Sequence, residues 1–173
     1  MITTRLELQY YIEQDAKSSM RKSINPHLFG DEIWKFQLNL RKLEYSINNH
    51  KVVSTFYRKI IHHYRSLQLG IEIHPNNFGE GLWIGHSNGI VVNPLARIGK
   101  NCTIMQNATI GNAGGGMNLV PTIGDNCYIG AGAIIIGDIE LGNDITIGAG
   151  AVVVKSCKKD NCTLVGVPAR SLY

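Results

Sequence analysis

The sequence TIGDNCYIGAGAIIIGDIELGNDITIGAGAVV, residues 122–153, carries an aliphatic residue at every sixth position, and glycine follows most of them. The same step extends back to Ile98 across one interruption. The aliphatic positions of the repeat are Ile98, Ile104, Ile110, Ile123, Ile129, Ile135, Leu141, Ile147 and Val153. A short fixed period of this kind is typical of a parallel β-solenoid, in which each unit forms one flat side and three units close a triangular turn.

A second apolar position lies four residues after each aliphatic residue and is mostly small. Its members are Cys102, Ala108, Cys127, Ala133, Ile139, Ile145 and Ala151. Between the two apolar positions lie Asn, Asp and Gly, which tolerate the positive φ angles of tight corners. Strands of a β-sandwich recur at longer intervals of roughly 8–12 residues. The pattern therefore predicts a mainly β protein in which both apolar positions point into a coil.

Residues 1–70 lack the six-residue repeat, and their apolar residues recur at a helical period instead. Three stretches are expected to be helices: residues 6–24, 31–47 and 52–69. Gly70 is expected to end the last of them. Because the apolar end of a solenoid must be covered, the sequence predicts a helical cap at 1–70 and a β-helix domain at 71–173.

The overall composition indicates which kinds of partner the protein can bind and in which cellular compartment it is expected. Among 173 residues, 17 are basic and 13 acidic, so the net charge is only +4. This mild charge suits a small anionic ligand better than a nucleic acid, which needs a strongly basic surface. No apolar run approaches the roughly 20 residues of a membrane span. The first 15 residues include acidic side chains and lack an apolar stretch, so they are not expected to be a secretory signal. The four cysteines form no C-x-x-C pair, so reduced thiols in a cytoplasmic protein are expected.

The six-residue period breaks at two places, and these are the candidate sites of chemistry. From Ile84 to Val92 the step is eight, and His86 lies in this break; a longer interruption covers residues 111–121. Histidine is the natural general base near neutral pH, although a histidine in a coil also serves simply to bond a turn. Only His74 and His86 lie in the coil, too few for a zinc site, so no metal is expected.

Five segments of the coil together resemble a known family. They are IEIHP from residue 71, LWIGHSNGIVV from 82, IMQNATIG from 104, TIGDNCYIGAGA from 122 and VGVPAR from 165. In this order, over residues 71–170, they resemble the hexapeptide-repeat acyltransferases of serine acetyltransferase type. The resemblance implies a left-handed parallel β-helix, a homotrimer, acetyl-CoA as donor, and active sites between adjacent subunits. Whether two trimers pair through their helical caps is left open.

The resemblance also assigns roles to individual residues. His86 matches the catalytic histidine of an H-x-x-G motif, and Glu72 stands in place of the aspartate that orients it, one methylene longer. Asn112 and Ala113 match a turn at the thiol end of CoA. The remaining matches are small residues along the pantetheine arm and basic residues near the nucleotide phosphates: Ala131, Ala149, Lys155 and Arg170. Small residues also suit coil corners, and basic clusters are commonly just solvated surface.

The sequence departs from the family where the acceptor is bound. Serine is a zwitterion, so its site needs both a carboxylate and a cation. Gly85 stands where the family has an aspartate, and Leu119–Pro121 where it has Arg-His-Pro. We therefore expect a neutral acceptor hydroxyl on a sugar, as in the capsule and exopolysaccharide O-acetyltransferases of this group. Two alternatives stay open: a serine O-acetyltransferase of cysteine biosynthesis, and a non-catalytic β-helix that binds a ligand or serves as a scaffold.

Overall fold

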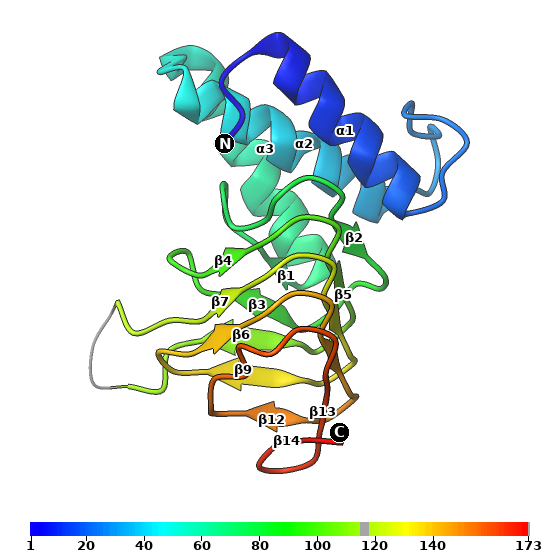
Figure 1. Ribbon diagram of the computed structural model, residues 1–173. Helices are drawn as coiled ribbons and strands as arrows, with labels where there is room; N and C mark the ends of the chain where they lie inside the picture. The colour runs from blue at the N-terminus through cyan, green and yellow to red at the C-terminus, as the bar shows by residue number, and fades with distance from the viewer. Residues whose placement is uncertain (115–117, 173) are drawn as a thin grey trace.

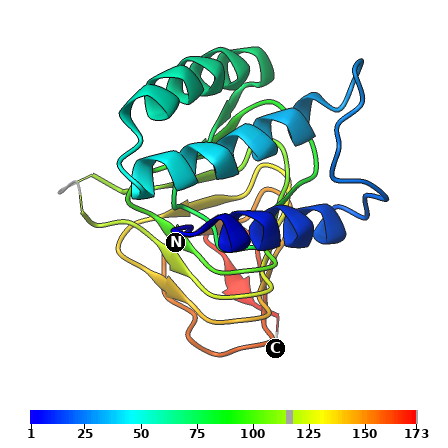
Figure 2. The same cartoon turned by 90° about the horizontal axis from the view of Figure 1, so that it is seen from above.

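Three helices lie across one end of a β-coil in the computed structural model, which describes residues 1–114 and 118–172 (Figures 1 and 2). They are α1 (Arg5–Ser18), α2 (Glu32–Asn48) and α3 (Val52–Leu69). As expected, α3 ends at Gly70, which adopts a left-handed conformation with φ 61°. In the described part of the chain, no helix has the length and apolarity to cross a membrane.

The first helix is shorter than the sequence pattern suggested. Met20 takes a left-handed φ of 53°, and its N–H donates to the Lys17 carbonyl at 3.0 Å. The N–H of Arg21 reaches back to the Ala16 carbonyl at 2.9 Å. This pair of bonds is the Schellman motif, which closes a helix. The motif usually has glycine where Met20 lies, so a helix end at Ser18 could not be predicted from the residue types.

The rest of the chain winds through three sheets, and every pairing between successive turns is parallel (Figure 1). Sheet A contains β1 (Ile71–Glu72), β3 (Ile90–Val92), β6 (Thr109–Gly111), β9 (Ile134–Ile136) and β12 (Val152–Val153). Sheet B contains β4 (Arg97–Ile98), β7 (Thr122–Ile123) and β10 (Glu140–Leu141). Sheet C contains β2 (Trp83–Ile84), β5 (Thr103–Ile104), β8 (Tyr128–Ile129), β11 (Thr146–Ile147), β13 (Thr163–Val165) and the antiparallel β14 (Arg170–Ser171).

The repeated aliphatic residues form stacked columns inside the coil, as predicted. Ile129 of sheet C pairs in register with Ile104 on one side and Ile147 on the other. The second apolar position is also buried, at Cys102, Ala108, Cys127, Ala133, Ile139, Ile145 and Ala151. Because every turn, or rung, repeats the same inward pattern, one continuous core runs through the coil.

The corners explain the polar and glycine positions of the repeat. Asn101, Asn126 and Asp144 take left-handed φ angles of 55°, 57° and 56° at equivalent corners. Their side chains stack, since the Asn126 amide accepts from Asn101 at 3.2 Å and donates to Asp144 at 3.1 Å. At Gly124 a Cβ would lie 2.5 Å from the Gly142 carbonyl oxygen. Side chains are therefore excluded where successive rungs approach most closely.

A buried guanidinium joins the helices to the first rung. Arg41 of α2 donates from Nε and Nη2 to Asp15 of α1 at 2.7 and 3.0 Å, and from Nη1 to Glu44 at 3.1 Å. The same group donates to the carbonyl oxygens of Phe78 and Gly79 at 3.0 and 2.6 Å. All five guanidinium N–H groups are thus used, and the two carboxylates raise the pKa of Arg41 despite its burial.

The carboxylates of this cluster complete the attachment. Asp15 Oδ1 accepts the backbone N–H groups of Gly81 and Leu82 at 2.8 and 2.9 Å. Glu44 Oε1 accepts the N–H of Asn76 at 2.9 Å. The helices therefore bond directly to the turn that leads into β2, just ahead of His86.

Replacing Arg41 by alanine should destabilise the protein by about 3–5 kcal/mol, because two carboxylates lose their buried counter-ion. Chemical denaturation would measure the loss in the free energy of unfolding. Arg65→Ala is the matched control, because Arg65 pairs with Glu32 in a partly exposed ion pair at 3.1 Å and its loss should cost less than about 1 kcal/mol. Equal losses in the two variants would contradict a central role for the Arg41 cluster.

Candidate active site

One edge of the coil collects several of the residues predicted to act in the site. This edge, here called the C–A edge, is where the chain turns from a strand of sheet C into the next strand of sheet A. His86 lies on it after β2, Ala131 after β8 and Ala149 after β11. Backbone bonds run along it, from Gly150 N–H to the Ala131 carbonyl at 2.8 Å. The structure thus brings the predicted base and both predicted pantetheine contacts into one line.

His86 stands outside the coil in the turn that is two residues longer than the six-residue unit. The residue is exposed. Asn88 and Gly89 take left-handed φ angles of 77° and 73°, and Asn88 N–H donates to the Leu69 carbonyl at the end of α3 at 2.8 Å. No hydrogen bond to the His86 ring occurs within residues 1–114 and 118–172. The imidazole is therefore held by its backbone alone and is open to a reactant.

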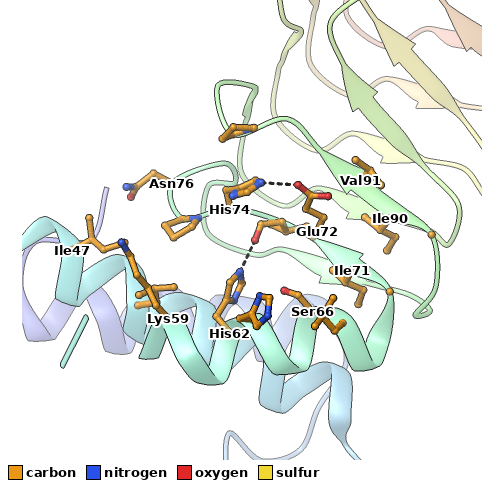
Figure 3. Close-up of a pocket in the computed structure, with 18 residues that line it drawn as sticks. Ile47, Lys59, His62, Ser66, Ile71, Glu72, His74, Asn76, Ile90 and Val91 are labelled. Atoms are coloured by element: carbon orange, nitrogen blue, oxygen red, sulfur yellow. Dashed lines mark hydrogen bonds and ion pairs between the residues drawn. The ribbon is translucent and has the colours of Figure 1, made fainter. Parts of the chain in front are cut away.

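Glu72 lies on the outer face of β1, and its carboxylate is directed to a different histidine. Its Oε1 lies 3.3 Å from His74 Nε2, with 61% of the Glu72 side chain exposed (Figure 3). Within the chain, Glu72 thus bonds to His74 and not to His86. The orienting role of Glu72 toward His86 stays a prediction.

A groove of about 840 Å³ lies between α3 and the outer face of β1 and β3 (Figure 3). Its polar lining includes Lys59, His62, His63, Ser66, Glu72 and His74. His62 Nε2 donates to the Ile73 carbonyl at 2.9 Å, and burial lowers the pKa of this imidazole, so it is neutral near pH 7. Its lining also includes Gly89, in the turn that carries His86. Sequence analysis missed it, because it forms only where the helical cap meets the coil.

The residues matched to the thiol end of CoA lie on a different edge. Asn112 and Ala113 follow β6, and Lys155 follows β12, where the chain leaves sheet A for sheet B. All three are exposed. A strand of three residues spans roughly 10 Å, so sheet A separates them from the C–A edge. The middle of the predicted loop at 111–121, residues 115–117, lies outside the described residues.

The basic residues of the last turn are spread over two sides of the coil. Arg170 lies in β14, opposite Val165 of β13 in sheet C, and is exposed. Lys158 pairs with Glu140. Lys155 lies across sheet A from the C–A edge, so the structure does not gather these groups into a single pocket within one chain.

Gln106 is a further residue of the C–A edge that sequence analysis did not single out. It follows β5, one rung below His86, and its carbonyl accepts the N–H of Gly132 at 2.9 Å. Its side-chain Oε1 is buried without a partner among the described residues. Its position in the six-residue repeat is equivalent to that of Ala131, and this equivalence could have identified Gln106 from the sequence.

A catalytic metal finds no ready ligand set in the described residues. Across residues 1–114 and 118–172, no group of three or more His, Cys, Asp or Glu side chains converges. Structural and catalytic zinc sites use three or four protein ligands.

Several known proteins are similar to this chain in sequence. The family model "Bacterial transferase hexapeptide (six repeats)" matches residues 121–155. Serine acetyltransferase of Synechococcus elongatus is 36% identical over 117 residues, covering 66% of this chain and 48% of the relative. That of Synechocystis is 40% identical over 120 residues, covering 68% and 48%. The chain spans about half the length of these relatives.

Solved structures match nearly the whole chain. Serine acetyltransferase of Neisseria gonorrhoeae is 30% identical, with 98% of this chain and 68% of that chain covered and a TM-score of 0.75. The Brucella abortus enzyme in complex with Coenzyme A is 28% identical, with 97% and 68% covered and a TM-score of 0.79.

The fold is therefore the left-handed parallel β-helix of the hexapeptide-repeat transferases, with a small helical region at one end. Within that class, the chain belongs to the serine acetyltransferase family. The predicted fold and family type are confirmed. The closer likeness to capsule and exopolysaccharide enzymes finds no support among these relatives.

Proposed function

We propose that this protein is a cytoplasmic O-acetyltransferase that moves the acetyl group of acetyl-CoA directly to an acceptor hydroxyl. The observation that carries the proposal is the exposed His86 on the same edge as the small residues Ala131 and Ala149, two and three rungs below it. The Coenzyme A complex of the Brucella relative supports the choice of donor.

In the proposed reaction His86 acts first as base and then as acid. Its neutral imidazole takes the proton of the acceptor hydroxyl while the oxygen attacks the thioester carbonyl. The carbon–sulfur bond then breaks, and the CoA thiolate receives the proton from the imidazolium. A covalent acetyl-cysteine step is disfavoured, because Cys102, Cys127 and Cys162 are buried and Cys157 lies in the last turn of the coil.

The donor is proposed to lie along the C–A edge below His86. Gly132 and Gly150 follow Ala131 and Ala149 with φ angles of 68° and 67°, and a Cβ at Gly150 would meet nothing within 4 Å. Small residues at an open edge let a pantetheine arm approach the backbone. We assign Lys155 and Arg170, with their neighbouring cations, to the nucleotide phosphates.

The outer face of sheet A favours a homotrimer as the active form. The first strand carries Glu72 outward, but the next four carry aliphatic or β-branched residues: Val91, Thr109, Ile134 and Val152. The outward residues of sheet B are polar or charged: Arg97, Thr122 and Glu140. If three A faces surround a threefold axis, the C–A edge of each protomer adjoins the opposite edge of its neighbour. His86 would then meet Asn112 and Ala113 of the neighbouring protomer.

For the acceptor we propose a neutral sugar hydroxyl. The residue before His86 is glycine, and the space that a side chain there would enter is filled by the thioether of Met105. Leu119–Pro121 likewise offers no cation. A site without these ionic groups does not match the charges of serine. Serine is the second candidate, and the names of the relatives favour it.

His86→Ala should lower kcat by about 10²-fold or more, because a general base typically contributes about 10²–10⁴-fold. The assay would follow the release of the CoA thiol from acetyl-CoA, with an acceptor that the wild-type protein acetylates. CoA affinity and oligomeric state should not change. His27→Ala, which alters an exposed histidine of the cap, is the control, and full activity in the His86 variant would place the base elsewhere.

An acceptor screen tests the sugar assignment separately. Purified protein and acetyl-CoA would be incubated with L-serine and with a panel of monosaccharides and nucleotide sugars, again following thiol release. Sugar-dependent turnover is expected. Turnover with serine alone would replace the sugar by the second candidate, and CoA binding without turnover of any acceptor would favour the non-catalytic alternative.

Ile134→Lys should dissociate the trimer, because it places a charge on the outer face of sheet A. The molar mass measured by light scattering should fall from three times the 19.1 kDa chain mass to the mass of one chain. Thr122→Lys makes the matched change on sheet B and should leave the trimer intact. A trimer that survives the first change, or dissociates with the second, would contradict the proposed packing.

A further inference from the structure

Two cysteines face one another in the last turn of the coil. The turn between β12 and β13 carries Cys157 and Cys162, whose Sγ atoms lie 2.7 Å apart. A disulfide bond measures about 2.05 Å, so little movement separates this pair from bonding. Both thiols also approach the Lys159 carbonyl oxygen, Cys162 at 3.2 Å and Cys157 at 3.8 Å. The turn thus holds the two sulfur atoms toward each other.

The two thiols differ in accessibility, and burial also disfavours ionisation of Cys162. Cys157 is partly exposed, whereas Cys162 is only 4% exposed. Burial, together with the neighbouring Cys157 thiol, raises the pKa of Cys162 to about 11. Cys157 is therefore the thiol that attacks first, and Cys162 the one that follows.

We propose that Cys157 and Cys162 form a reversible intramolecular disulfide by exchange with a low-molecular-weight disulfide. The Cys157 thiolate attacks one sulfur of that disulfide, forms a mixed disulfide and releases one thiolate. Cys162 then attacks the Cys157 sulfur and releases the second small thiol, which takes up the Cys162 proton. Two protein thiols are oxidised and one small disulfide is reduced to two thiols, so no further oxidant is required.

The bond would close the open end of the coil. Cys157 exchanges backbone hydrogen bonds with Glu140 and Gly142 of the rung above, at 3.0 and 2.9 Å, and the Cys162 carbonyl accepts the N–H of Thr146 at 2.9 Å. On the far side of this rung β14 pairs with β13, whereas in the described part of the chain no strand pairs there with the stretch around Cys157. That stretch is therefore the part of the rung most able to open. Linking residues five apart restricts that opening and fixes the turn that presents Lys158 and Lys159.

The test treats the full-length protein with oxidised glutathione, then blocks free thiols, denatures the chain and digests it with trypsin. Cleavage at Lys158 and Lys159 separates the cysteines into peptides 156–158 and 160–170. We expect two of the four thiols to be lost and these peptides to be recovered linked. Dithiothreitol should return all four thiols.

Two matched variants define the order of events. Cys162→Ser should keep one glutathione on Cys157, because the second thiol is missing, whereas Cys157→Ser should take up none. Cys102 and Cys127, both buried inside the coil, should stay reduced throughout. Unlinked peptides in the treated wild type, glutathione retained on its Cys157, or prior oxidation of Cys102 and Cys127 would each overturn the proposal.

Discussion

The stacking of successive rungs in strict register is the constraint on which this molecule depends. Parallel strands lie about 4.8 Å apart, so each position of the six-residue unit becomes a column through the coil. Inward columns make the core, as in the row that contains Ile104, Ile129 and Ile147. Outward columns make surfaces of uniform character. The proposed active site lies along one such column. The outer faces of sheets A and B are two others, and they differ in the residue types they present.

The coil alone does not determine where the first rung begins. That rung has no rung above it, and several of its backbone groups bond instead to Asp15, Arg41 and Glu44 of the helices. The ion cluster therefore supplies the hydrogen-bond donors and acceptors that a further rung would otherwise supply. It also fixes the stretch that leads into the His86 turn, so the helical cap supports the candidate site as well as the core.

The features that follow from the period were predictable from sequence, and those that depend on contacts between distant elements were not. The columns, the left-handed corners and the edge position of His86 all derive from a local repeat. By contrast, the pairing of Glu72 with His74 and the groove beneath α3 depend on how the cap meets the coil. Asn112 and Ala113 could be matched by motif, but only the winding order reveals that sheet A separates them from His86. The stop at Met20 was hidden because a non-glycine residue occupies the left-handed position.

Gly85 and His86 lie two rungs above Ala131 and three above Ala149 on the same edge. Since a rung contacts only the rungs beside it, mutations in the upper turn leave the geometry of the lower ones unchanged. A scaffold of this kind can acquire a new acceptor preference while the lower part of the C–A edge, proposed to hold the donor, is inherited intact. Divergence among such proteins is then expected to concentrate in one turn and one loop, while the remaining rungs preserve the core and the positions proposed to hold the donor.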